Sequence, residues 1–364
     1  MANPPFRTIH QIIKAARLRL NQTYWDYLVG GTETETTLRR NRLAIDRLAL
    51  RPRILNDVSS IDTSGRFLGH ELSIPCMLAP IGSLQVFEEG GGATAARAAG
   101  EAGIMSIASS VCTPDIEEIA AASDAPKIYQ LYVRGDANWV DAIIKRVIDS
   151  GYSAFCLTVD TAVVSRRERD IAKGVIPTSQ AGGGINAGDF SYQAKLNWDD
   201  VKRIKDKFDI PLVLKGINRV EDAAKAVEMG VDVVYVSNHG GRQLDQGPGA
   251  LDLLPDIVAE VGGRAEIAVD GGFYRGTDIV KAIALGANAV GLGRLEAWAM
   301  AAGGAPVVVN MLGILRHEIQ TALALCGVTR FADLDESFIS DADPVYEPSV
   351  FSAFPLLDVD DEGY

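Results

Sequence analysis

One nine-residue segment, 237–245, carries residue types that can move a proton and hold an anion. It reads Ser-Asn-His-Gly-Gly-Arg-Gln-Leu-Asp and directly follows the apolar run 232–236. The imidazole of His239 titrates near neutral pH, and the guanidinium of Arg242 can grip a carboxylate with two hydrogen bonds. A buried histidine beside a surface arginine is the alternative for this segment taken alone. If a strand end presents both side chains, they form a base and a carboxylate anchor in one pocket.

Further polar residues stand at the ends of other short apolar runs. Asp160 could face His239 and raise its basicity, or it could cap a helix. Arg167 follows seven residues later. Lys215 could stabilise negative charge on a bound ring system, form a Schiff base with a carbonyl substrate, or lie outward in solvent. The other residues singled out at these ends are Pro80, Ile81, Gly82, Ser109, Gln130, Tyr132, Thr158 and Ser237.

Two glycine-containing turns indicate a site for a phosphate. The first is Asp270-Gly271-Gly272, and the second is Gly293-Arg294. Glycines let backbone N–H groups approach a phosphate closely, and an arginine completes such a site. The chain has no Walker motif and no GxGxxG strand–helix unit, so a phosphate cofactor would be bound in a barrel mode. The four histidines are isolated from one another, and we therefore expect no metal site.

Eight short apolar runs must position these residues. Most of these runs are separated by a segment with a helical pattern. Alternation of this kind calls for parallel strands with crossover helices, and eight units predict an α/β fold of the (β/α)8 TIM barrel type. Functional groups then lie at the carboxyl ends of the strands. The expected strands are 76–79, 104–108, 127–131, 154–158, 211–215, 232–236, 266–270 and 289–293.

The barrel is expected to occupy residues 76–330, between an N-terminal helical cap at 1–75 and a C-terminal tail at 331–364. Helical periodicity over 9–20 supports the cap, and 307–326 is expected to be a helix. The longest interval between strands follows strand 4 and is rich in glycine from 177 to 189. Such a loop would be mobile on the catalytic face, or it could be an insertion without function.

Composition limits the class of protein. The chain has 364 residues, of which 47% are hydrophobic and 23% charged, with a net charge of −13. This charge argues against nucleic acid or an anionic membrane as a partner. The four cysteines are scattered, which favours thiols in a reducing compartment. There is no signal pattern and no apolar run of membrane-spanning length. We expect a soluble, cytoplasmic protein.

The chain resembles the FMN-dependent 2-hydroxy acid oxidases and dehydrogenases, a family that includes glycolate oxidase, lactate oxidase and mandelate dehydrogenase. The resemblance is carried above all by SNHGGRQLD at 237–245, which matches the active-site signature of the family. It extends from about residue 23 to about residue 327. The other matching segments are RPRIL at 51–55, QLY at 130–132, LTVDT at 157–161, LKGI at 214–217 and RGTD at 275–278.

The resemblance implies FMN as cofactor and a role for each matching residue. His239 would be the catalytic base, with Asp160 as its carboxylate partner and Lys215 beside the flavin. Arg167 and Arg242 would hold the substrate carboxylate. Tyr27 and Tyr132 would hydrogen-bond the substrate. The residues that would line the cofactor or its phosphate are Pro80, Ile81, Gly82, Ser109, Gln130, Thr158, Lys215, Ser237, Asp270, Gly271, Gly272, Arg275, Gly293 and Arg294.

The reaction implied is oxidation of an (S)-2-hydroxy acid to the 2-oxo acid, with O2, giving H2O2, or another acceptor reoxidising the flavin. The family also implies a homo-oligomer, a tetramer or an octamer. Another FMN barrel enzyme, such as an isopentenyl diphosphate isomerase, is an alternative, but it would not need Arg167 and Arg242 around a histidine. A flavin-binding protein that has lost catalysis is a second alternative, and the intact His239 argues against it.

The sequence departs from the family pattern at four places. Tyr274 stands where an arginine usually binds the phosphate, and Val111 stands where a tryptophan is common. Glu88 and Glu89 replace a His-Pro pair, and Leu295 replaces a proline. We expect Val111 to enlarge the substrate pocket. The position of Gly82 near the flavin does not separate an oxidase from a dehydrogenase.

Overall fold

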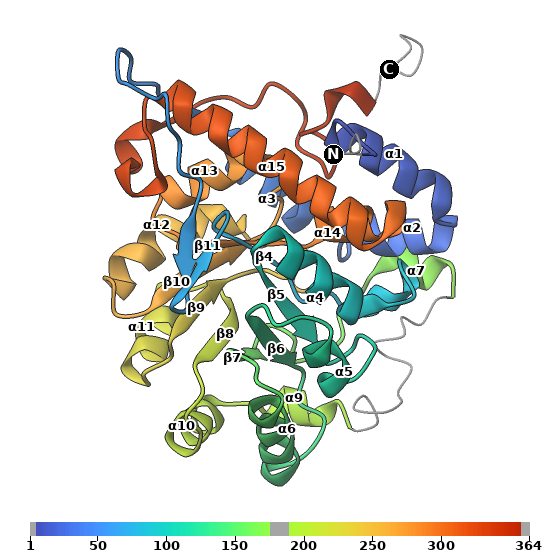
Figure 1. The fold of residues 1–364 in the computed structure, drawn as a ribbon. Coiled ribbons are helices and arrows are strands. Elements are labelled where there is room, and N and C mark those ends of the chain that lie inside the picture. The colour runs from blue at the N-terminus through green and yellow to red at the C-terminus, as the bar shows by residue number, and fades with distance from the viewer. Residues whose placement is uncertain (1–4, 175–188, 358–364) are drawn as a thin grey trace.

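A computed structural model describes residues 5–174 and 189–357, and its centre is a closed barrel of eight parallel strands (Figure 1). The strands follow one another around the barrel in chain order, and β11 pairs with β4 to close it. This confirms the predicted TIM barrel. The strands are β4 (Cys76–Leu78), β5 (Met105–Ser109), β6 (Lys127–Leu131), β7 (Ala154–Thr158), β8 (Leu212–Ile217), β9 (Val233–Val236), β10 (Glu266–Asp270) and β11 (Ala289–Leu292).

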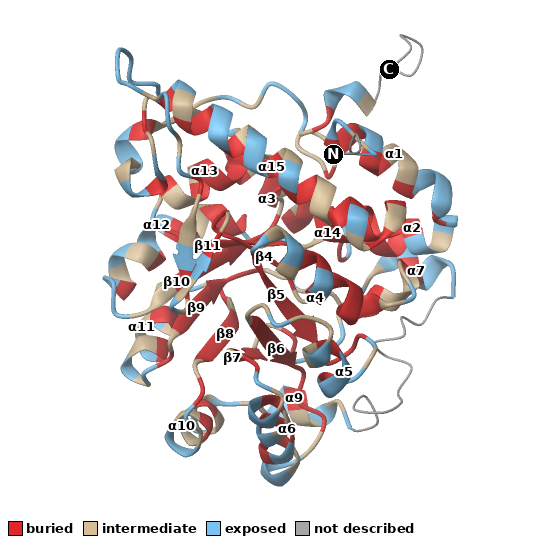
Figure 2. Cartoon of the chain, viewed as in Figure 1, coloured by how far each residue is buried: buried red, intermediate tan, exposed pale blue. Residues whose placement is uncertain are grey.

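Helices surround the barrel and cover its outer face. They are α4 (Gly91–Ala102), α5 (Ile116–Ala121), α6 (Ala137–Asp149), α10 (Trp198–Lys207), α11 (Val220–Glu228), α12 (Ala250–Val261), α13 (Gly276–Ala284), α14 (Arg294–Gly303) and α15 (Ala305–Cys326). The strands are buried throughout most of their length, whereas the helices are buried on one side and exposed on the other (Figure 2). This is the pattern expected when parallel strands are covered on both faces.

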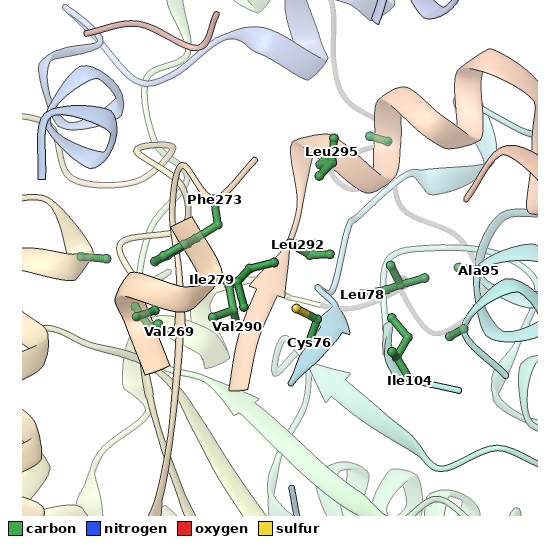
Figure 3. Packing of buried hydrophobic residues seen from close by; sticks show 14 of the residues in the cluster. Cys76, Leu78, Ala95, Ile104, Val269, Phe273, Ile279, Val290, Leu292 and Leu295 are labelled. Carbon is green, nitrogen blue, oxygen red and sulfur yellow. The ribbon is translucent and has the colours of Figure 1, made fainter. Parts of the chain in front are cut away.

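Two layers of apolar side chains hold the barrel together, because successive residues of a strand point to opposite faces. Met77, Ile128 and Val213 belong to a cluster that fills the interior. Their neighbours in sequence face the helices. Cys76, Leu78 and Val290 lie in this outer layer, as Figure 3 shows for the region around β4 and β11.

Strand β8 extends two residues beyond its predicted end at Lys215. The extension contains an irregularity between Lys215 and Ile217, where Gly216 has a φ of +115°. A Cβ atom on Gly216 would lie 2.6 Å from the Cβ of Asp160. Glycine is therefore required here for the carboxylate of Asp160 to approach the barrel mouth.

The prediction that residues 1–75 form only a helical cap is incomplete. The segment contains α1 (Ile9–Arg19), α2 (Gln22–Val29) and α3 (Thr36–Asp46), but also three short strands. Strands β2 (Gly65–Phe67) and β3 (His70–Leu72) form a hairpin. Phe67 joins the interior cluster, and the Leu68 amide donates to Glu266 at the start of β10. The hairpin thus closes the amino-terminal end of the barrel.

The C-terminal segment is packed against the rest of the chain. Its strand β12 (Ile339–Asp341) pairs antiparallel with β1 (Leu48–Leu50), and the rings of Phe338 and Phe354 are buried. The interval after β7 also contains α7 (Glu168–Ala172) and α9 (Ser191–Lys195). The predicted glycine-rich loop, apart from its last residue, and the acidic end at 358–362 lie outside the described residues. Within the described ranges, no helix is both long and apolar enough to cross a membrane.

Candidate active site

A cavity of about 1360 Å³, measured with its open mouth, lies at the carboxyl ends of the barrel strands. The residues of the sequence analysis that line it are Tyr27, Pro80, Ile81, Gly82, Tyr132, Arg167, Lys215, His239, Arg242, Asp270, Gly271, Gly272, Gly293 and Arg294.

The segment after β9 turns sharply and presents His239 to the cavity. His239, Gly240 and Gly241 have φ angles of +60°, +63° and +74°. A left-handed φ at a non-glycine residue is uncommon and is concentrated at functional sites. The amide of His239 donates to the Ser237 hydroxyl at 3.1 Å. A Cβ on Gly241 would lie 2.5 Å from the backbone of Leu38. The glycines of the signature are therefore needed for the turn itself.

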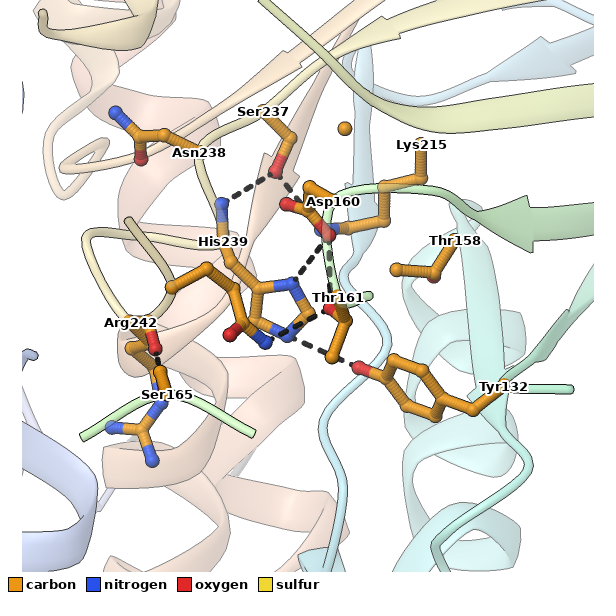
Figure 4. Close-up of polar contacts among 12 residues, drawn as sticks. Tyr132, Thr158, Asp160, Thr161, Ser165, Lys215, Ser237, Asn238, His239 and Arg242 are labelled. Carbon is orange, nitrogen blue, oxygen red and sulfur yellow. Dashed lines mark hydrogen bonds and ion pairs between the residues drawn. The ribbon is translucent and has the colours of Figure 1, made fainter. Parts of the chain in front are cut away.

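His239 lies between Asp160 and Tyr132 (Figure 4). Its Nδ1 is 3.1 Å from Asp160 Oδ1, and its Nε2 is 3.1 Å from the Tyr132 hydroxyl. A carboxylate at Nδ1 holds the proton on that nitrogen and leaves the Nε2 lone pair toward the cavity. The expected pairing of Asp160 with His239 is present in the structure.

The electrostatics of this pair favour a neutral imidazole and an ionised carboxylate. Burial lowers the pKa of His239, and it outweighs the neighbouring Asp160, which raises it. Burial favours the neutral form of Asp160, but His239, Lys215 and Thr161 together hold the pKa of its carboxyl below the ordinary value. At neutral pH His239 is therefore able to accept a proton, and the charge of Asp160 stabilises the imidazolium that forms.

Two arginines lie on the same side of the cavity as Tyr27. The guanidinium of Arg242 donates to the carbonyls of Tyr27 and Gly30 at 2.7 and 2.9 Å and lies 4.9 Å from the Tyr27 ring. Arg167 is the N-cap residue of α7, and its Nε donates to Ser165. Burial, followed by the charge of Arg167, lowers the pKa of Arg242. Because the charge of Arg167 disfavours the charged form of Arg242, an anion bound beside Arg242 would stabilise it.

Lys215 is the cation at the base of the cavity. It is buried, donates to the Ser237 hydroxyl at 2.9 Å, and lies 3.5 Å from the carboxylate of Asp270. Although burial alone would lower the pKa of Lys215, the carboxylates of Asp270 and Asp160 raise it above the ordinary value. The side chain is therefore an ammonium at neutral pH, which disfavours a Schiff base and favours stabilisation of negative charge.

Four residues expected to contact the cofactor lie beneath the lining of the cavity. Ser109 donates to Gln130 at 2.8 Å, and Gln130 donates to Thr158 at 2.8 Å. The hydroxyl of Ser237 donates to Asp270 at 2.7 Å. All four side chains are buried. The structure thus brings them together as hydrogen-bonded supports, and direct contact with the cofactor stays a prediction for them.

The turns after β10 and β11 form the end of the cavity suited to a phosphate. Gly271 and Gly272 have φ angles of +111° and +86°, and a Cβ on Gly293 would meet nothing within 4 Å. Arg294 also lines this end. Its terminal nitrogens donate to the carbonyls of Gly240 and Gly30 at 2.9 and 2.8 Å, and its Nε is buried without a hydrogen-bond partner among the described residues. Open space beside glycine backbone, with a buried cation lining the same end, fits the phosphate of FMN.

Arg275 does not belong to this phosphate site, and its expected role is corrected. Its guanidinium lies 2.6 Å from Glu318 on α15, and it does not line the cavity. Its backbone caps α13, which directs the side chain toward α15. Tyr274 lines the cavity instead, with Arg42 5.7 Å from its ring.

Other cavity residues were not identified from the sequence. Phe87, Arg134, Val164 and Phe190 line the cavity. Arg134 stands two residues beyond Tyr132 in the same strand-to-helix connection, a position that could have pointed to it. Val111, one of the four departures, also lines the cavity, as expected of a residue that shapes the pocket. Among residues 5–174 and 189–357, no group of His, Cys, Asp or Glu side chains is arranged to hold a metal ion.

This combination of barrel, glycine-lined end and histidine–carboxylate pair fits an enzyme that binds a phosphate-bearing cofactor. Residues 16–341 match the model of the FMN-dependent dehydrogenase family, and the chain belongs to this family. It is therefore an FMN-dependent enzyme that oxidises its substrate.

Three relatives illustrate the range of the family. The chain is 40% identical to an L-lactate oxidase of Nostoc sp. over 347 residues, which cover 89% of this chain and 95% of the relative. It is 38% identical to glycolate oxidase 1 of Oryza sativa subsp. indica over 94% of this chain and 96% of the relative. A peroxisomal (S)-2-hydroxyacid oxidase of Arabidopsis thaliana is 35% identical over 91% of this chain and 95% of the relative.

Solved structures of mandelate oxidase share the fold closely. One, a tyrosine-to-phenylalanine variant of that enzyme with (S)-mandelic acid, superposes with a TM-score of 0.86 at 34% sequence identity, covering 94% of this chain and 100% of that one. The structure of mandelate oxidase with benzoyl-formic acid gives the same values. The likeness includes the whole barrel and therefore the strand ends that form the cavity.

Proposed function

We propose that the protein oxidises (S)-2-hydroxy acids to 2-oxo acids and passes the electrons to O2, giving H2O2. The observation that carries this proposal is the meeting of His239, Arg167 and Arg242 in one cavity that also contains Lys215 and the phosphate end. The names of the relatives, which are lactate, glycolate and mandelate oxidases, support the substrate class. They also favour O2 over another acceptor.

Each residue has a defined share in the reaction. The guanidinium groups of Arg167 and Arg242 bind the substrate carboxylate, which fixes the face of Cα and so selects one enantiomer. Tyr27 and Tyr132 position the substrate by hydrogen bonds. His239 accepts one proton through Nε2, and Asp160 stabilises the resulting imidazolium.

FMN, when bound, supplies the acceptor for the two electrons and the second hydrogen that leave the substrate. The protein favours that transfer through Lys215, whose ammonium is placed to offset negative charge on a bound ring. Arg294, Gly271 and Gly272 would hold the phosphate. The balance is complete when the 2-hydroxy acid loses two hydrogens and O2 becomes H2O2.

The two alternative functions are less well supported by the site. An isomerase acting on a diphosphate could bind its substrate with Arg167 and Arg242, but it would not need a histidine base beside them. A flavin protein without catalysis has no need of the Asp160–His239 pair. The oligomeric state stays a prediction, and light scattering on the purified protein would measure it. The cytoplasmic location also stays a prediction, since three relatives are named peroxisomal.

The proposal is tested by anaerobic titration of the purified yellow protein with a panel of 2-hydroxy acids. Flavin absorbance should bleach with the (S) enantiomers and return when O2 is admitted, with release of H2O2. His239→Ala should keep FMN bound and slow bleaching by about 100-fold or more, the effect of removing a positioned base. Bleaching at the normal rate in this variant would refute the role of His239.

A further inference from the structure

A third arginine lines the cavity, and the mechanism above gives it no role. Arg134 follows β6 and is 9% exposed. It stands two residues beyond Tyr132, whose hydroxyl contacts His239. Both side chains line the cavity, and Tyr132 is close enough to influence the pKa of Arg134. Because β6 lies across the barrel from β10 and β11, Arg134 lies away from the turns that form the phosphate end.

The guanidinium of Arg134 has an aromatic partner that orients it. It lies over the ring of Phe190, 4.9 Å from the ring centre, and Phe190 also lines the cavity. Such stacking favours one plane for the guanidinium. A guanidinium held in one plane offers the two-pronged geometry that a carboxylate accepts.

The charges that line the cavity also favour an anionic group on the substrate. Five cationic side chains line it among the described residues, namely Arg134, Arg167, Lys215, Arg242 and Arg294, and one carboxylate, Asp270, lines it with them. Asp160, Asp170 and Glu35 lie behind the lining, where their charges raise the pKa values of Lys215, Arg242 and Arg294. Lys215 is paired with Asp270. The proposed function assigns Arg167 and Arg242 to one carboxylate and Arg294 to the phosphate. Burial lowers the pKa of Arg134, so an anion bound beside it would stabilise its charged form.

We propose that Arg134 binds a second carboxylate, carried on the substrate's side chain, and that the preferred substrates are (S)-2-hydroxydicarboxylates. This inference rests on the proposed function and names its substrate class. The chemistry at Cα is unchanged, and the second carboxylate takes no part in the electron balance. Val111 is compatible with it, because a side chain smaller than tryptophan leaves room for a substrate longer than glycolate.

The test compares acids that differ only at the far end of the side chain. The first pair is (S)-2-hydroxyglutarate and (S)-2-hydroxyvalerate, and the second is (S)-malate and (S)-2-hydroxybutyrate. The wild-type enzyme should prefer the dicarboxylate of at least one pair by about 10- to 100-fold in kcat/KM, the range for a charge-assisted hydrogen bond of about 1.5–3 kcal/mol.

Arg134→Met should remove this preference while leaving kcat/KM for the monocarboxylate within about threefold. Arg134→Lys should keep part of the preference, because the charge remains. Arg166→Met is the matched control, since it removes one exposed positive charge that is paired with Glu168 and does not line the cavity. It should keep the full preference. A normal flavin spectrum in each variant shows that the fold and the cofactor site are intact.

Three results would overturn the inference. One is a wild-type enzyme that oxidises the monocarboxylate of both pairs at least as well as the dicarboxylate. Another is an Arg134→Met variant that loses activity equally on both members of a pair, which indicates a structural role. The third is equal loss of preference in Arg166→Met. If no 2-hydroxy acid bleaches the flavin, the proposed function itself has failed.

Discussion

Replacing Asp160 with asparagine isolates the contribution of one buried charge to proton transfer. The carboxylate lies 3.1 Å from His239 Nδ1, and its side chain is 9% exposed. Two unit charges about 4 Å apart interact by about 4 kcal/mol at an effective dielectric of about 20. The asparagine oxygen still accepts the Nδ1 hydrogen bond, so we expect the lower range of about 1.5–3 kcal/mol. This corresponds to a roughly 10- to 100-fold slower flavin reduction.

The pH dependence distinguishes this role from simple structural damage. The rate should rise with pH as His239 loses its proton, and it should be level at neutral pH because the pKa of His239 is lowered below 6.5. Asp160 raises the pKa of His239, so Asp160→Asn should move the acid limb to still lower pH. At the same time, the plateau should fall because the imidazolium is less stable.

The assay is anaerobic stopped-flow reduction with saturating (S)-lactate over a range of pH. Asp256→Asn, at an exposed position on α12, is the control for loss of a negative charge far from the site. It should behave as the wild type. The reasoning is refuted if Asp160→Asn is reduced at the wild-type rate. It is equally refuted if the plateau falls while the acid limb stays in place.

Three further predictions concern the substrate and the cofactor. Arg167→Met should raise KM for any 2-hydroxy acid by about 10- to 100-fold, as expected for a lost charged hydrogen bond, with the flavin spectrum unchanged; unaltered KM and kcat would count against the clamp. Val111 should allow (S)-mandelate to outperform glycolate, and Val111→Trp should reverse that order; a wild-type preference for glycolate would show that other groups close the pocket. Tyr274→Phe should weaken FMN binding about 3- to 10-fold in fluorescence titrations of the apoprotein, the range for one neutral hydrogen bond, whereas riboflavin should bind as before; equal weakening of both would mean that the ring, not the hydroxyl, matters. Arg294→Met serves as the reference variant. It should weaken FMN binding more than Tyr274→Phe does, and it should likewise leave riboflavin binding unchanged.

Much of the fold followed from local patterns. Eight apolar runs with helical intervals predicted the barrel, and their ends predicted where polar groups gather. The pattern works because each strand must bury both faces, so its sequence is continuously apolar and easily located. Hairpin β2–β3 was missed because its strands have three residues each and owe their place to the barrel interior that Phe67 enters. The pairing of β1 with β12 joins segments that are far apart in the chain, as with Leu48 and Asp341, and has no local signal.

The chemical groups of the site were determined by the sequence. Type and spacing indicated His239 and Arg242, whereas the roles of Asp160 and Arg167 followed from the resemblance to the family. Only the tertiary structure decided which way each side chain points. Arg275 and Tyr274 are adjacent in sequence. The ion pair with Glu318 holds Arg275 away from the cavity, whereas Tyr274 lines it. Arg134 enters the site because Phe190, which follows in the chain only after β7, lies against it. Orientation depends on partners that are distant in sequence, and those partners meet only when the barrel closes.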